Sequence, residues 1–412
     1  MGLDDPGTQV PLVTIAREWG RIGSIGFGGP PAHITLLRKL CVDQRGWLSA
    51  EEFEDGIAAA NLLPGPASTQ LAIFCAWRLA GPAGAIIGGA CFILPGLVVI
   101  LALASLFLAT HPPLWISGAA AGAGAAVPAV ATAAAITLVP ASWSRAGGAR
   151  NQHRAGPGRP RLRWFGYLVA GMAAALAAGT FLVLVLAGCG LIEMAFRLRQ
   201  PGGPSSDNGP GESGGSAGVG GRRALLPLAA AAPAAGGLLA LAWVAFKVGA
   251  LSYGGGFVIV PLMQRDAVGT YHWMTGAQFL SAVALGQVTP GPLVQTVAVV
   301  GYAAAGFGGG VLAALIAFTP SFVFVLAGAR RFALLRRSTP VQAFLTGAGP
   351  VAIGAIAGST IPLAFELAHL WQLAVLGLAA LWLIALRKNV VAAIVGAACL
   401  GIIAALAGAP VG

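Results

Sequence analysis

Two kinds of Gly/Pro-rich break interrupt the apolar stretches of this chain, and each kind occurs twice. The first reads Phe27-Gly28-Gly29-Pro30 and returns as Tyr253-Gly254-Gly255-Gly256. The second reads Pro64-Gly65-Pro66 and returns as Pro290-Gly291-Pro292. Proline removes a backbone donor and clashes with the preceding turn, whereas glycine permits positive φ and close backbone approach. Each break is therefore predicted to end one helix and to begin another within an apolar stretch.

A helix that begins after such a break exposes backbone N–H groups and the positive end of its dipole, which together bind anions. We expect the glycines to supply open N–H groups, the prolines to hold the breaks, and Gln and His side chains to donate directly. With two breaks in each half, up to four helix ends can face one site, an arrangement that suits a small oxyanion. The candidate substrate-binding residues are Gly28, Gly29, His33, Pro64, Gly65, Pro66, Gln70, Gly254, Gly255, Gly256, Pro290, Gly291, Pro292 and Gln295.

Three cations near the breaks, Arg21, Lys247 and Arg78, are candidates for charge contacts with an anion, because ionisable residues inside membrane segments are costly. The competing interpretation is that these side chains snorkel to the interface. His33 has no counterpart, since Ile259 stands at the matching position, so a structural role for His33 is left open beside the binding role. A single break could be an ordinary kink, but matched pairs favour a function.

The breaks belong to a longer internal repeat. Phe27 and Tyr253 lie 226 positions apart, and so do Trp47 and Trp273, which means that about 40 residues match without a gap. In a hydrophobic protein, such a repeat is typical of a transporter built from two halves.

The composition supports an all-α polytopic membrane protein. Hydrophobic residues make up 57% of the chain and charged residues only 9%, against about 25% charged residues in soluble domains. The apolar runs are continuous rather than alternating, which argues against a β-barrel. The net charge of +11 comes from arginines in loops, as positive-inside topology requires, so a nucleic-acid partner is not expected. The start of the chain is acidic and lacks the basic region of a cleavable signal peptide.

The chain divides into an N-terminal half (1–199), a Gly/Ser/Pro-rich linker (200–224) and a C-terminal half (225–412). About 10–12 membrane segments are expected. In the first half they are placed near 12–36, 57–80, 84–109, 115–140 and 164–197, and in the second near 226–262, 279–305, 309–328, 342–366, 370–386 and 390–409. Arginines precede and follow 164–197, which predicts two short helices that turn near Gly179.

Loop charges predict that the two halves are inverted. The loop at 110–113 carries no Lys or Arg, whereas the matching loop of the second half carries four arginines between 330 and 337. One step later the pattern reverses: six arginines lie between Arg145 and Arg163, but none between Glu366 and Trp371. By the positive-inside rule, equivalent loops lie on opposite sides of the membrane. The halves are therefore predicted to be inverted-topology repeats with broken helices.

Several motifs resemble the chromate ion transporter family in its long, two-domain form. In the first half these are F-G-G-P-x-A-H at 27–33, W-L-S-x-x-E-F at 47–53 and L-P-G-P-x-x-x-Q at 63–70. The second half has Y-G-G-G-x-x-x-x-P-L at 253–262 and Q-V-T-P-G-P at 287–292. The resemblance implies two homologous halves of inverted topology, and export of chromate across the plasma membrane that confers chromate resistance.

We therefore expect a multi-pass protein of the inner (plasma) membrane that exports chromate. A carrier or exchanger of sulfate or another oxyanion is the alternative, because these anions share charge and shape. An enzyme is not expected, since the repeated segments carry almost no nucleophilic, acid–base or metal-binding groups, and no cofactor or metal is expected either. The sequence has no ATP-binding P-loop, so uniport, proton-linked and exchange schemes stay open. Expected partners are chromate, sulfate as a competing anion and membrane lipid, and a homodimer is left open.

Overall fold

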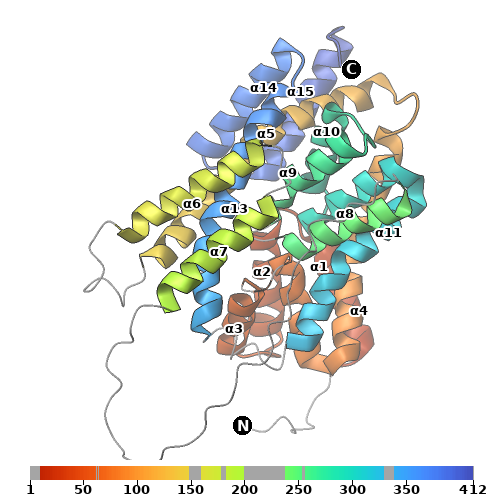
Figure 1. Cartoon of the computed structure of the whole chain (residues 1–412). Helices are drawn as coiled ribbons and strands as arrows, with labels where there is room; N and C mark the ends of the chain where they lie inside the picture. The colour runs from red at the N-terminus through yellow and green to blue at the C-terminus, as the bar shows by residue number, and fades with distance from the viewer. Residues whose placement is uncertain are drawn as a thin grey trace, which may run out of the picture.

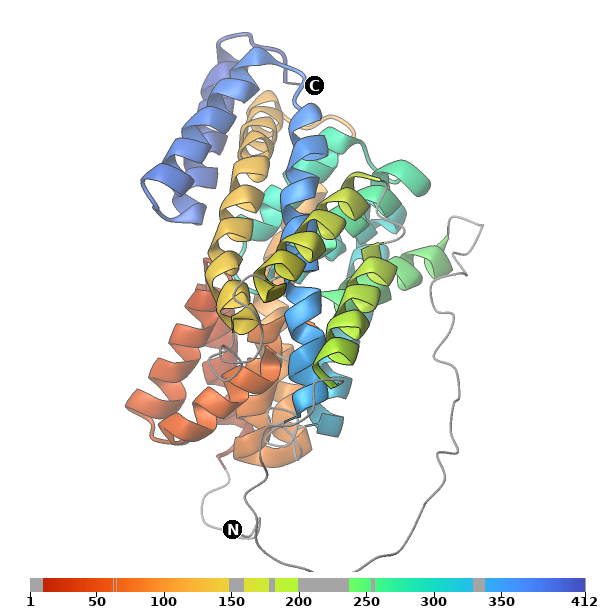
Figure 2. The same ribbon diagram turned by 60° about the vertical axis from the view of Figure 1, so that its left-hand side comes forward.

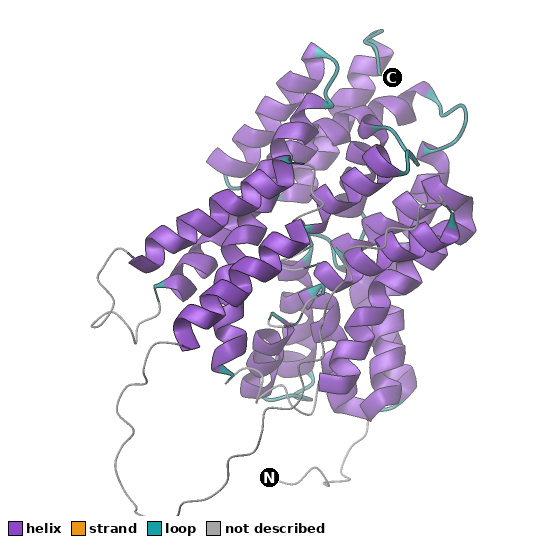
Figure 3. Ribbon diagram, viewed as in Figure 1, coloured by secondary structure: helices purple, strands orange, loops and turns teal. Residues whose placement is uncertain are grey.

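The computed structural model describes residues 10–61, 63, 65–147, 159–177, 182–198, 237–252, 256–328 and 338–411. These residues form helices joined by loops and turns, without a strand (Figure 1, Figure 3). The all-α prediction is confirmed. Several predicted features lie outside the described residues, namely Pro64, Gly254, Gly255, Gly179 and the linker at 200–224.

The helices of the two halves follow one another in the same order. The first half contains α1 (Leu12–Ile25), α2 (Pro30–Arg38), the π-helix η1 (Lys39–Gln44), α3 (Ala50–Ala60), α4 (Ala67–Phe107), α5 (Leu114–Ala146), α6 (Arg159–Leu176) and α7 (Leu182–Leu198). The second half contains α8 (Leu238–Leu251), α9 (Ile259–Gln264), the π-helix η2 (Arg265–Thr270), α10 (Gly276–Val288), the 3₁₀-helix η3 (Leu293–Gln295), α11 (Thr296–Gly328), α13 (Thr339–Phe365), α14 (Leu370–Ala380), the π-helix η5 (Leu381–Ala385) and α15 (Val390–Leu406). Helix α1 thus corresponds to α8, α3 to α10, α4 to α11 and α5 to α13.

Four stretches among the described residues are long and apolar enough to cross a bilayer: α4, α5, η3 with α11, and α13. Shorter apolar helices, α8, α10, α14 with η5, and α15, pack around them. Because several long apolar helices lie in one chain, the protein is a multi-pass membrane protein, and the family described below places it in the plasma membrane.

Helices α4 and α11 each reverse direction at a glycine. Gly81 has a φ of 58° and Gly306 a φ of 64°, and the alanine before each is also non-helical. Beyond the bend the chain folds back on itself, since a Cβ at Gly84 would collide with the carbonyl oxygen of Ala76. Each helix therefore has a first arm and a second arm that run antiparallel. The segments predicted at 84–109 and 309–328 are the second arms.

The first arm of α4 pairs with α3 to form a hairpin, which we call the first hairpin (residues 50–79). The Ser49 hydroxyl caps α3 by accepting from the Glu52 amide at 3.1 Å, and Arg78 pairs with the Glu52 carboxylate across the base. Burial works to raise the pKa of Glu52, but hydrogen bonds from Ser49 and Arg78 outweigh it and hold that pKa below its usual value. Gly56 of α3 packs closely against Phe74 in the first arm of α4.

The second hairpin (residues 276–304) joins α10 to the first arm of α11 in the same way. Its α10 begins with an equivalent capping box, in which Thr275 accepts from the Gln278 amide at 3.2 Å. Helix α3 has 11 residues and is roughly 16 Å long at 1.5 Å per residue, which is about half of a hydrocarbon core of about 30 Å. The described residues of the Pro-Gly-Pro breaks form the hairpin tips, and a helix of this length that starts at the membrane surface reaches about the middle of the bilayer.

The two halves are inverted with respect to each other. Helix α10 lies beside the start of α5, where the Ser281 hydroxyl donates to the Ala120 carbonyl at 3.1 Å, and beside the end of α13, where Gly276 abuts Glu366. Helix α3 instead faces the end of α5 and the start of α13. Helices α3 and α10 thus lie toward opposite ends of the molecule (Figure 1), and α5 and α13 run antiparallel (Figure 2).

The last two helices of each half cover the long helix of the other half. Helices α6 and α7 pack on α13, and α14 and α15 pack on α5 (Figure 2). The predicted helix pair in 164–197 is confirmed as α6 and α7. Its members are joined through the buried Glu193, which accepts from Arg163 Nε at 3.0 Å, Arg197 Nε at 2.9 Å and the Tyr167 hydroxyl at 3.2 Å.

The inverted arrangement predicts labelling from opposite faces of the membrane. In a background without the five native cysteines, His111→Cys before α5 and Ser338→Cys before α13 should react with impermeant thiol reagents from opposite sides. The measurement is labelling in right-side-out and everted membranes. Reaction of both positions from one side would contradict the inversion.

Candidate functional site

The tip of each hairpin is hydrogen-bonded to the other half. The Gly65 amide donates to the Ser252 carbonyl at 2.8 Å, and the Gly291 amide donates to the Gly26 carbonyl at 3.1 Å. Gly65 and Gly291 are repeat equivalents, and so are Gly26 and Ser252, so the two bonds are one contact made twice. These two glycine amides are consequently not open in this structure, contrary to the role predicted for them, and instead join the halves.

The second arms of α4 and α11 support the tips. A Cβ on Gly65 would lie 3.1 Å from the Ser321 hydroxyl of α11, and a Cβ on Gly96 of α4 would collide with the Pro290 carbonyl at the other tip. Gly96 and Ser321 are equivalent positions of the two halves. They lie 225 positions apart, as do Gly81 and Gly306, the glycines at which α4 and α11 reverse. The first tip therefore packs on the second arm of α11, and the second tip packs on the second arm of α4.

Both predicted glutamines lie at the tips, fully buried. Gln70 is directly beside Gly65, and Gln295 is beside Gly291. The Gln295 amide nitrogen donates to the Ile93 carbonyl on the second arm of α4 at 2.8 Å. The structure therefore brings Gly65, Gln70, Gly291 and Gln295 into the region where the halves meet.

His33 is also buried in this region, where it connects the two kinds of break. Its Nε2–H donates to the Gly26 carbonyl at 2.8 Å, and its Nδ1 lies 3.2 Å from the Ser68 hydroxyl. The ring also packs edge-on against Phe92, with 5.0 Å between ring centroids. In this conformation His33 fastens the start of α4 to the end of α1.

Gly28, Gly29, Gly256, Pro66 and Pro292 lie at or just before helix starts. Gly28 and Gly29 have φ values of 100° and 72°, which only glycine adopts readily, and Gly29 caps α2. Gly256 has a φ of 93° just before α9. Pro66 and Pro292 are the N-cap residues of α4 and η3. In each half, one helix therefore ends before each of the two breaks and another begins after it, as expected.

Buried polar atoms without a hydrogen-bond partner gather at the tips. Among the described residues these include the hydroxyls of Thr69, Ser252 and Ser321 and the amide oxygen of Gln295. Buried polar atoms in proteins are nearly always paired, and an unpaired one costs about 1–3 kcal/mol. A set of such atoms beside helix N-termini is what a polar ligand would satisfy.

The three predicted charge contacts are not at the tips. Arg78 pairs with Glu52 at the hairpin base, and Lys247 Nζ lies 2.6 Å from the Asp266 carboxylate. Arg21 is largely exposed and lies 3.6 Å from Glu18. These positions are those of residues that fasten helices near the membrane surface.

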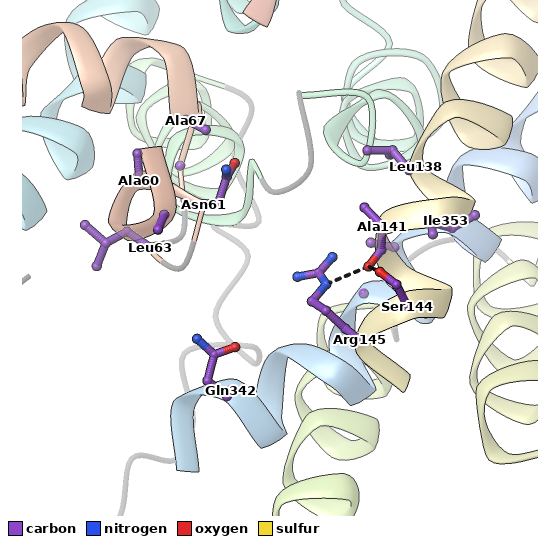
Figure 4. Close-up of a pocket in the computed structure, with 14 residues that line it drawn as sticks. Ala60, Asn61, Leu63, Ala67, Leu138, Ala141, Ser144, Arg145, Gln342 and Ile353 are labelled. Atoms are coloured by element: carbon purple, nitrogen blue, oxygen red, sulfur yellow. Dashed lines mark hydrogen bonds between the residues drawn. The ribbon is translucent and has the colours of Figure 1, made fainter. Parts of the chain in front are cut away.

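A cavity of about 430 Å³ opens beside the tip of the first hairpin, within the size range of small-ligand sites (Figure 4). Its walls are the tip with Asn61 and Gly65, the end of α5 with Ser144 and Arg145, and the start of α13 with Gln342. Arg145 was not among the sequence candidates, because it belongs to an arginine-rich stretch that topology already explained. At the other end of the molecule, α10 packs directly on α5.

Two inverted halves, helices broken within apolar stretches and a cavity leading to one break define a membrane transport protein rather than an enzyme. The chromate transporter family model matches residues 13–194 and 239–402, which is most of the chain. The chain belongs to the chromate transporter family.

Curated relatives agree with this assignment. The chain is 32% identical to a chromate transport protein of Cupriavidus metallidurans over 84% of its own length and 80% of the relative's. It is 30% identical to a chromate transport protein of Pseudomonas aeruginosa over 84% and 79% of the two lengths. A probable chromate transport protein of Synechococcus elongatus is 28% identical over 90% and 89%. No solved structure matches the chain.

The contact between the second tip and α4 can be tested with a pair of equivalent substitutions. Gly96→Ala places a methyl group against the Pro290 carbonyl and should destabilise the protein by about 1–3 kcal/mol. Ser321→Ala, at the equivalent position of the second half, removes a buried hydroxyl that has no partner among the described residues and should be neutral or stabilising. Thermal unfolding of the purified proteins measures both. Equal melting temperatures for the two variants would show that the tip does not rest on α4.

Proposed function

We propose that this protein exports chromate across the plasma membrane, with the anion held between the tips of the two hairpins. The observation that carries the proposal is the convergence of helix N-termini and unpartnered buried polar atoms at these tips. The first amides of a helix have no partner within it, and they sit at the positive end of the dipole. The hydroxyls of Thr69, Ser252 and Ser321 rotate freely enough to donate to an oxyanion.

The direction of transport follows from charge. An inside-negative membrane potential favours the exit of a dianion by roughly 4–5 kcal/mol per 100 mV, at about 2.3 kcal/mol per charge. Export therefore needs no nucleotide, and a cell that expresses the protein gains chromate resistance. Uniport, proton-linked transport and exchange differ in what they require besides the potential, and collapse of the proton gradient at fixed potential distinguishes proton-linked transport from the other two.

Sulfate is the second candidate substrate. The groups at the tips are generic N–H and O–H donors, which serve any small tetrahedral dianion equally. A carrier or exchanger of sulfate with the same architecture is therefore tested together with chromate export.

Everted membrane vesicles test the proposed function directly. Vesicles that contain the protein should accumulate labelled chromate when the potential is positive inside the vesicle, and excess sulfate should reduce the rate. Vesicles from cells without the protein are the control. Equal accumulation with and without the protein would refute chromate export, and accumulation of sulfate alone would assign the second substrate.

The hairpin tips should be essential to transport. Gly65→Val and Gly291→Val should each abolish most chromate transport, because φ is 126° and 103° at these positions and the new side chains displace the neighbouring glutamines. The matched control is Gly46→Val, since Gly46 also has positive φ, 59°, but lies in an exposed loop away from the tips. Transport per folded molecule, measured after size-exclusion chromatography, should fall only in the tip variants. Unimpaired transport in both tip variants would reduce the breaks to simple kinks.

A further inference from the structure

Among the described residues that line the cavity beside the first hairpin, Arg145 is the one with a charged side chain. The others are apolar residues, glycines, a serine and the amides Asn61 and Gln342. Arg145 Nε donates to the Ala141 carbonyl one turn earlier at 3.1 Å, which fixes the side chain against α5. Figure 4 shows the guanidinium extending into the space between Leu63 and Gln342.

The second half has no such cation at the equivalent place. Pro128 of α5 and Pro350 of α13 lie 222 positions apart, and so do Pro140 and Pro362. The same spacing places Leu367 at the position of Arg145. The position before it is Glu366, which abuts the start of α10. The two ends of the molecule thus differ in charge as well as in openness.

The end that carries Arg145 is the cytoplasmic end by the positive-inside rule. The stretch from Arg145 to Arg163 contains six arginines, and the stretch before α13 contains four between 330 and 337. The end of α5 and the start of α13 both border the cavity. The cavity therefore opens toward the side from which an exported anion must come.

We propose that this cavity is the cytoplasmic intake vestibule of the transporter and that Arg145 recruits the oxyanion there before it reaches the tip at Gly65. The planar guanidinium matches the paired oxygens of a tetrahedral oxyanion, which a lysine ammonium does not. A cation in a partly desolvated cavity raises the local concentration of anions and disfavours cations and neutral solutes. This inference rests on the proposed function and adds the residue that selects the substrate.

The kinetic test separates recruitment from the later transport step. In everted vesicles, whose cytoplasmic face is outward, Arg145→Gln should raise the KM for chromate about tenfold, the loss expected for one hydrogen bond to a charged group, and change the maximal rate little. Arg145→Lys should give an intermediate KM. The matched control is Arg161→Gln, because Arg161 stacks on Trp143 nearby, 5.3 Å from the ring centroid, but does not line the cavity. An unchanged KM in Arg145→Gln, or an equal rise in Arg161→Gln, would overturn the proposal.

A second measurement needs no transport and so remains valid if the proposed function fails. Gln342→Cys, in the background without the five native cysteines, places a thiol on the cavity wall. Its rates of reaction with an anionic and a cationic methanethiosulfonate reagent report the local potential. Adding Arg145→Gln should lower the anionic-to-cationic rate ratio by about fivefold. An unchanged ratio would show that Arg145 does not set the potential of the cavity, whatever the protein transports.

Discussion

A backbone broken inside a membrane must find hydrogen-bond partners within the protein, because hydrocarbon offers none and each unpaired group costs several kcal/mol. In this chain the two Pro-Gly-Pro tips solve that problem by pairing across the repeat. Gly65 donates to Ser252 and Gly291 to Gly26, so neither half can satisfy its own break. Gly26 also accepts from His33, which ties the same carbonyl to the start of α4. The halves also contact each other through their last helices. Helices α6 and α7 pack on α13, and helices α14 and α15 pack on α5.

Pseudo-symmetry gives the molecule two equivalent hairpins, and the two hairpins pack differently against α5 and α13. On one side the first hairpin is separated from α5 and α13 by a cavity, whereas on the other α10 rests on α5 through Ser281 and Ala120. Because the halves are built alike, an exchange of these two arrangements would expose the proposed site between the tips to each side in turn. Inverted repeats would then supply alternating access without a separate moving domain.

The features that could be predicted from the sequence are those that require particular residue types. Gly/Pro breaks, loop arginines and a constant spacing were sufficient for the repeat, the inversion, the positions of the helix breaks and the helix pair α6–α7. The reversals at Gly81 and Gly306 fall at the predicted boundaries between 57–80 and 84–109 and between 279–305 and 309–328, although only the first is marked by a proline, Pro82. Arg145 escaped because topology accounts for any arginine in that stretch. The cross-half acceptors Gly26 and Ser252 are carbonyl groups, which no residue pattern identifies.

The distribution of charge suits a carrier that must release what it binds. Near the tips the polar side chains of the described residues are amides, hydroxyls and the His33 imidazole, while Glu52 and Asp266, away from the tips, are paired with Arg78 and Lys247. A formal cation at the tips would bind a dianion strongly in a medium of low dielectric constant and slow its departure. Helix ends and neutral donors attract it more weakly, and conduction requires binding strong enough for capture but weak enough for release. If the protein exports an anion as proposed, Arg145 on the cavity wall, with Leu367 at the equivalent position of the second half, favours capture on the side from which that anion is collected.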